Sequence, residues 1–185
     1  MNRALILHHS RTGTTAAYSE NIAAELLGKG IETKVLPLYQ VCSETVDGFD
    51  TIFIGCWTSG LMFFLQKPEK IWVEYVKKLP ALKNKEIVLF TTYKILTGSM
   101  FNEMKKHLPD HASVSLVKLK SRNGNLTDSN RQLLNLLTNN RLSASPPSPS
   151  PALAPLTGEG ALRAGFNSYT TNSRKDTKEV NHNHK

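Results

Sequence analysis

Short apolar segments and longer amphipathic segments alternate along residues 1–140 of the chain. Runs of aliphatic, β-branched and aromatic residues predict five strands, at residues 4–9, 31–38, 50–57, 86–92 and 113–120. Apolar residues at helical spacing predict four helices, at residues 15–28, 66–79, 99–108 and 127–139. This alternation is typical of an α/β fold, in which a doubly wound parallel sheet carries helices on both faces.

The strand patterns also indicate where a ligand would bind. The run Ala4-Leu5-Ile6-Leu7 is apolar at successive residues, as expected of a strand that is covered on both faces. Residues 113–120 alternate apolar with polar side chains, which predicts a strand nearer the edge. Ligands bind beyond the carboxyl ends of the strands in such sheets, so three loops are candidates, at residues 10–15, 57–60 and 92–98.

The composition changes after residue 140. Residues 143–155 are rich in Ser, Pro and Ala, and residues 156–185 are polar with no sustained apolar period. Segments of this kind cannot bury a core. We therefore predict a folded domain over residues 1–140 and a disordered tail over residues 141–185.

Charge, cysteine content and the lack of long apolar runs limit the partners, sites and location that the sequence predicts. The formal net charge is +8, which favours acidic partners or anionic ligands, and no known nucleic-acid-binding module accompanies it. Cys42 and Cys56 match no metal or redox spacing. No signal peptide is visible, and no apolar run approaches the ~20 residues of a membrane helix. We expect a cytoplasmic protein with reduced thiols, no membrane span and no metal site.

The loop Ser10-Arg11-Thr12-Gly13-Thr14-Thr15 follows the first predicted strand and opens the first predicted helix. Free N–H groups and the dipole of a helix N-terminus favour an anion, and the hydroxyls add donors. The loop lacks the Gly-Lys-Ser/Thr of nucleoside-triphosphate-binding loops and the three glycines of the dinucleotide fingerprint. A single phosphate held by neutral donors is one interpretation, and an ordinary Ser/Thr-rich turn with an N-cap is the other.

With these residues the chain resembles the flavodoxin family. The loop at residues 10–15 matches that family's Ser/Thr-x-Thr-Gly-x-Thr phosphate loop at every defined position. The segment Gly48-Phe49-Asp50-Thr51-Ile52-Phe53-Ile54-Gly55 is similar to the family's entry into its third strand. The resemblance covers roughly residues 3–140 and implies a five-stranded sheet of strand order 2-1-3-4-5.

The resemblance implies a non-covalently bound FMN. Its phosphate would lie at residues 10–15, its ring between Trp57 and Tyr93, and its N5 edge near the backbone of residues 58–60. Trp57 and Tyr93 as ordinary core residues at the edge of the sheet are the alternative. The implied cofactor-binding set is Ser10, Arg11, Thr12, Gly13, Thr14, Thr15, Trp57, Thr58, Ser59, Gly60, Thr92, Tyr93 and Gly98.

The implied function is electron transfer through this flavin. An electron carrier and a small FMN-dependent oxidoreductase of the quinone reductase type both fit, with a redox protein or a small-molecule acceptor as partner. The oligomeric state stays open. The family's electron carriers are typically acidic around the ring, whereas this chain is basic and has Lys94 in a loop expected near the ring, so Lys94 is expected to raise the flavin potential. The alternative is a flavin-free binding or regulatory module.

Two other classes with similar topology are excluded by single residues. A phosphorylated receiver domain needs an Asp at the end of the first strand, where this chain has His8-His9-Ser10. A low-molecular-weight phosphatase needs a Cys nucleophile in its phosphate loop, and residues 10–15 contain none.

Overall fold

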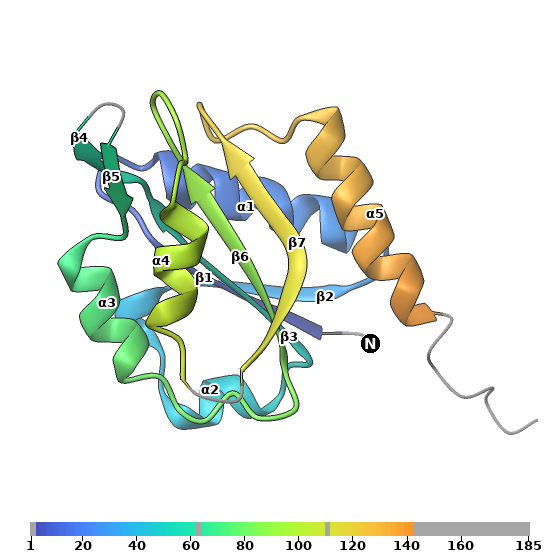
Figure 1. The fold of residues 1–185 in the computed structure, drawn as a ribbon. Coiled ribbons are helices and arrows are strands. Elements are labelled where there is room, and N and C mark those ends of the chain that lie inside the picture. The colour runs from blue at the N-terminus through green and yellow to red at the C-terminus, as the bar shows by residue number, and fades with distance from the viewer. Residues whose placement is uncertain (1–2, 62–63, 110–111, 143–185) are drawn as a thin grey trace, which may run out of the picture. The chain divides into compact units, whose positions relative to one another are not determined.

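A five-stranded parallel sheet forms the middle layer of the protein. This computed structural model describes residues 3–61, 64–109 and 112–142, and its sheet has the order β2-β1-β3-β6-β7 (Figure 1). The strands are β1 (Arg3–His9), β2 (Glu32–Pro37), β3 (Thr51–Trp57), β6 (Glu86–Thr92) and β7 (Ser113–Ser121). In chain order this is 2-1-3-4-5, so the predicted fold is confirmed, and β7 lies at the edge as predicted.

Helices cover both faces of the sheet (Figure 1). One layer holds α1 and α5, and the other holds the short η1, α2, α3 and α4. Their bounds are α1 (Thr14–Leu27), η1 (Leu38–Gln40), α2 (Ser43–Asp47), α3 (Lys70–Lys77), α4 (Met100–Lys106) and α5 (Asp128–Leu142).

Successive residues of the central strands face opposite layers. In β1, Ile6 packs in one core cluster with Tyr18 of α1, whereas Leu5 packs in the other with Trp72 of α3. All four side chains are fully buried. Burying each aliphatic side chain stabilises the fold by about 1.5–3 kcal/mol. The two-sided packing explains why these strands are apolar at every position and not at every second one.

The segment between β3 and α3 differs from the prediction. Residues 57–60 were expected as a loop, but β4 (Ser59–Leu61) pairs antiparallel with β5 (Phe64–Lys67) in a separate two-stranded sheet. The helix predicted over 66–79 begins only at Lys70. Pro68 disfavours helical backbone at Lys67, which ends β5, and α3 begins after Glu69, its extended N-cap.

The other predicted elements are present, with ends shifted by a few residues. The predicted cap of the last helix is confirmed, since the Asn130 N–H donates to Thr127 Oγ1 at 3.2 Å. The predicted tail falls almost entirely on residues 143–185, outside the described residues, so the division at residue 140 stays a prediction. Among the described residues, no helix is long and apolar enough to cross a membrane.

Candidate functional site

The loop between β1 and α1 leaves polar groups without hydrogen-bond partners among the described residues. Gly13 has a φ of +84°, in the left-handed region that favours glycine, and α1 begins at the next residue. No side chain in the described part of the chain caps this helix end, so its first N–H groups are available to a ligand. Among the described residues, Ser10 Oγ is buried without a hydrogen-bond partner. A buried, unpaired hydroxyl beside an uncapped helix N-terminus fits a phosphate group.

The carboxyl ends of β3 and β6 hold this loop in place through hydrogen bonds. Thr15 is buried, and its hydroxyl lies 2.7 Å from the hydroxyl of Thr92, the last residue of β6. The Thr58 N–H donates to the Thr92 carbonyl at 2.7 Å. Thr91 Oγ1 donates to the Cys56 carbonyl, also at 2.7 Å. These contacts fix the ends of α1, β3 and β6 against one another, so Thr15 supports the loop through its side chain.

A cavity of about 400 Å³ opens at the carboxyl ends of β1, β3, β6 and β7. It is lined by Arg11, Thr12, Thr14, Trp57, Thr58, Thr92, Tyr93, Lys94 and Arg122. All of these except Lys94 and Arg122 belong to the predicted cofactor-binding set. The sheet therefore brings together three loops that are far apart in the sequence, as its parallel topology predicts.

Other members of the predicted set do not line this cavity. Ser59 and Gly60 lie in β4. Gly98 packs against β5 instead, because a Cβ built on it would come within 2.0 Å of Gln66 Oε1. Its φ of +41° adds a second reason for glycine at this position. The structure thus places Gly98 in the contact between the β6–α4 loop and the hairpin.

A carboxylate fixes the wall of the cavity formed by Trp57. The indole N–H of Trp57 donates to Glu69 Oε2 at 2.9 Å. The same oxygen lies 2.7 Å from His9 Nε2, and the side chains of His9 and Glu69 are only 17% and 24% exposed. Glu69 stands at the N-cap of α3 but makes no cap hydrogen bond with its side chain. Its carboxylate instead orients the ring that faces the cavity.

The charge of Glu69 depends on these neighbours. Burial acts to raise the pKa of Glu69, but hydrogen bonds from Trp57 and His9 outweigh it and leave the pKa below its usual value. The positive charge of Arg11 also lowers the pKa of Glu69. Sequence reasoning missed Glu69, because a Glu after a proline at a helix start gives no sign of a partner twelve residues earlier.

Cations lie beside both aromatic walls. The Arg11 guanidinium is 5.8 Å from the centre of the Trp57 ring, and the Arg122 guanidinium is 6.0 Å from the centre of the Tyr93 ring. Lys94 joins them at the cavity, as the sequence predicts. Arg122 was missed. The signal was its place two residues after the last predicted strand, at the same end of the sheet as the other candidate loops.

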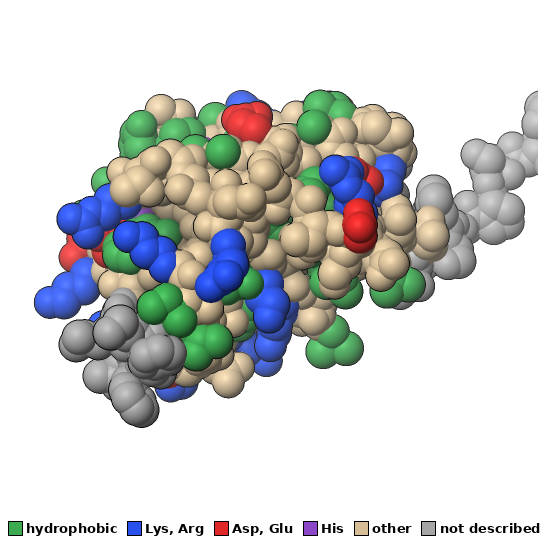
Figure 2. Space-filling view, turned by 90° about the horizontal axis from the view of Figure 1, so that it is seen from above, with side chains coloured by type: hydrophobic (Ala, Val, Ile, Leu, Met, Phe, Trp, Pro, Cys, Tyr) green, Lys and Arg blue, Asp and Glu red, His purple; other side chains and the backbone are tan. Residues whose placement is uncertain are grey.

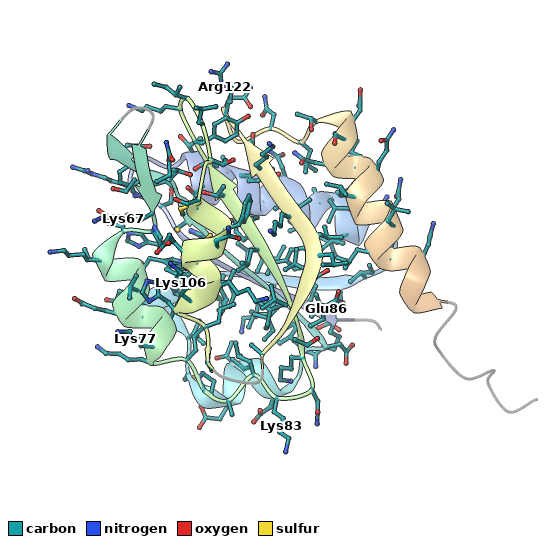
Figure 3. The ribbon with its side chains drawn as sticks, in the orientation of Figure 1. Lys67, Lys77, Lys83, Glu86, Lys106 and Arg122 are labelled. Atoms are coloured by element: carbon teal, nitrogen blue, oxygen red, sulfur yellow. The ribbon has the colours of Figure 1, made fainter. Side chains whose placement is uncertain are left out.

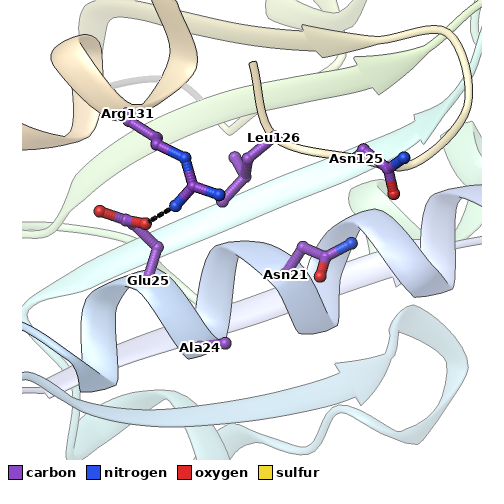
Figure 4. Close-up of a pocket in the computed structure, with 6 residues that line it drawn as sticks. All are labelled: Asn21, Ala24, Glu25, Asn125, Leu126 and Arg131. Atoms are coloured by element: carbon purple, nitrogen blue, oxygen red, sulfur yellow. Dashed lines mark hydrogen bonds and ion pairs between the residues drawn. The ribbon is translucent and has the colours of Figure 1, made fainter. Parts of the chain in front are cut away.

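A second hollow lies between α1 and the start of α5, and it lacks these features. Figure 4 shows it lined by Asn21, Ala24, Glu25, Asn125, Leu126 and Arg131. Glu25 pairs there with Arg131, and the Lys29 ammonium contacts its other oxygen at 2.7 Å. A hydrogen bond from Lys29 lowers the pKa of Glu25. The charges in this hollow are therefore already paired with one another.

Known structures share the fold. The two-electron reduced flavodoxin of Megasphaera elsdenii has a TM-score of 0.59 and 22% identity, over 70% of this chain and 94% of that chain. The flavodoxin of Streptococcus pneumonia TIGR4 has a TM-score of 0.57 and 14% identity, over 77% of this chain and 99% of that chain. Rubredoxin oxygen:oxidoreductase from Desulfovibrio gigas has a TM-score of 0.56 and 15% identity, over 78% of this chain and 37% of that chain.

Comparison of the sequence with family models shows which family the chain belongs to. Residues 5–115 match the family model described as a flavodoxin domain. The match includes the uncapped loop at residues 10–15 and both aromatic walls of the cavity. It covers more than half of the chain, so this protein belongs to the flavodoxin domain family.

Proposed function

We propose that this chain binds FMN without a covalent bond in the cavity at residues 10–15, 57–58 and 92–94, and that it transfers electrons through the bound flavin. The observation that carries the proposal is the buried Ser10 hydroxyl, which has no partner among the described residues and lies beside the uncapped end of α1. Membership in the flavodoxin domain family supports the choice of FMN over other phosphate-bearing ligands.

The phosphate would be held mainly by neutral donors. Thr12 and Thr14 line the cavity, and Ser10, whose hydroxyl is buried, precedes them in the same loop. Gly13 allows the backbone to turn into α1 so that helix N–H groups face the anion. Thr15 would contribute by keeping this turn attached to Thr92, because its own hydroxyl is already paired.

The flavin ring would lie between Trp57 and Tyr93. Both rings are half-buried and line the cavity, so they offer flat apolar surface that excludes water. Glu69 would keep the Trp57 ring in place through the indole N–H. The predicted contacts of Ser59 and Gly60 with the ring edge belong to this proposal too.

The flavin supplies the redox chemistry, namely the uptake and release of electrons at the ring. The residues of this chain bind the cofactor, orient it and set the electrostatic field around it. Arg11, Lys94 and Arg122 are positive, and a positive field favours the form of a cofactor that carries more electrons. No side chain of the cavity is assigned as an acid or base.

An absorbance titration of the purified full chain with FMN tests the proposal. We expect flavin bands that shift on binding, quenching of FMN and Trp fluorescence, and bleaching on reduction by dithionite. Riboflavin, which lacks the phosphate, serves as the matched ligand and should bind far more weakly. A chain that shows no spectral change with FMN would overturn the proposal and favour the flavin-free binding module.

A further inference from the structure

The mouth of the cavity carries positive charge from three separate loops. Arg11 comes from the β1–α1 loop, Lys94 from the β6–α4 loop, and Arg122 from the end of β7. All three side chains are exposed, and no Asp or Glu is among the described residues that line the cavity. Glu69 is turned toward Trp57 and His9. Figure 2 looks onto this end of the molecule and shows Lys and Arg side chains across its middle.

Exposed apolar side chains lie in the same surface. Ile95 and Leu96 directly follow Lys94 and are 39% and 50% exposed. The Arg122 side chain reaches back to this loop, where its Nε donates to the Lys94 carbonyl at 3.3 Å. We call the surface formed by Arg11, Lys94, Ile95, Leu96 and Arg122 the basic rim.

We infer that the basic rim docks the acidic surface of an electron-transfer partner protein. A small anion would need donors that converge in a buried pocket, whereas these cations are exposed and lie on different loops. Exposed apolar residues among charges are typical of a protein interface. The inference rests on the proposed function only in taking the partner to be a redox protein.

Charge of one sign at the mouth also steers the approach of a partner. Attraction between oppositely charged surfaces raises association rates, and salt weakens it because the Debye length falls from about 30 Å at 10 mM to about 10 Å at 0.1 M ionic strength. Docking at the rim would bring the partner over the cavity. The attraction of an acidic partner should therefore be strong at low salt, and it should depend on the charges of the basic rim more than on the net charge of the chain.

The test uses one haem protein in two charge states. Unmodified cytochrome c is basic, and the same protein becomes acidic when its lysines are succinylated. Binding of each to the full chain without FMN is measured by calorimetry at about 10 mM and about 150 mM ionic strength. The rim variant combines Lys94→Glu with Arg122→Glu. Its control, Lys77→Glu with Lys83→Glu, changes the net charge equally; Figure 3 shows Lys83 at the opposite end of the sheet from Arg122.

We expect the succinylated protein to bind at low salt and the unmodified protein to bind much more weakly. The rim variant should bind the succinylated protein about 30-fold more weakly, which corresponds to about 2 kcal/mol, and the control variant should bind it within about twofold of the parent. Circular dichroism checks that both variants fold.

Three results would overturn the inference. These are equal binding of the two cytochrome forms, equal weakening by the rim and control variants, and tighter, rim-dependent binding of a single-stranded oligonucleotide. In an added arm, the FMN-loaded and reduced chain should reduce the succinylated cytochrome more slowly as salt rises. Failure to bind FMN would appear in the flavin spectrum and leave the binding result unchanged, so the two proposals fail separately.

Discussion

Replacing Ser10 by Ala should change ligand binding and stability in opposite directions. In the free protein, Ser10 Oγ is buried with no partner among the described residues. A buried hydroxyl without a partner costs about 1–3 kcal/mol, and the lower end applies because Ser10 as a whole is only half-buried. Ser10→Ala removes this cost and only one atom, so the free energy of unfolding of the free protein should rise by up to about 1 kcal/mol.

Ser10→Ala should also lower the affinity for FMN. A hydrogen bond to a charged group contributes about 1.5–3 kcal/mol, which corresponds to roughly 10- to 100-fold in affinity. Urea unfolding of the free protein measures the first effect, and quenching of FMN fluorescence measures the second. Higher stability together with weaker FMN binding distinguishes a ligand contact from a structural one, because loss of a structural hydrogen bond would lower the free energy of unfolding.

Thr33 provides a matched control. Its Oγ1 is also buried with no partner in the described part of the chain, but it lies in β2 opposite Ala4, toward the start of the parallel strands and away from the cavity. Thr33→Val should raise stability in the same way and leave FMN affinity within about twofold. The reasoning is refuted if Ser10→Ala binds FMN as tightly as the parent, or if both variants weaken binding equally.

Three further predictions concern the walls of the cavity and the turn into α1. Glu69→Gln should lower the free energy of unfolding at pH 7 and shift the fluorescence emission of Trp57. The fold lowers the pKa of Glu69 from 4.5, so the stability that its carboxylate contributes is present above pH 4.5 and lost as the pH falls. The urea midpoint of the variant should therefore change less than that of the parent between about pH 5 and 3. Gly13→Ala and its control Gly30→Ala, both at positive φ with open space for a Cβ, should each cost about 1–2 kcal/mol in urea unfolding, and only the former should weaken FMN binding. Lys94→Gln should lower the flavin midpoint potential by on the order of 20 mV in dye-equilibration titrations, the effect of losing one exposed charge near the ring, and an unchanged potential would contradict this.

The strands and the turn from β1 into α1 could be predicted because their signals are local. A strand buried on both faces needs apolar side chains at every position, as in Ala4–Leu7, and a turn into an uncapped helix needs glycine and small donors. The β4–β5 hairpin gave no such signal, because its strands are short and form a sheet of their own. Glu69 gave none either, and Arg122 gave only its place near the end of the last predicted strand, because the groups that each contacts meet it only after the sheet forms.

The hydroxyls of the loop show how the fold divides similar residues between tasks. Thr14 and Thr15 are adjacent, and a helix turns by about 100° from one residue to the next. Thr14 therefore faces the cavity, whereas Thr15 faces β6 and is bonded to Thr92. The sequence motif cannot separate the two roles, because it records only residue type and spacing. Loss of the Thr15 hydroxyl should accordingly act on FMN through the position of the loop, and loss of the Thr14 hydroxyl through a direct contact.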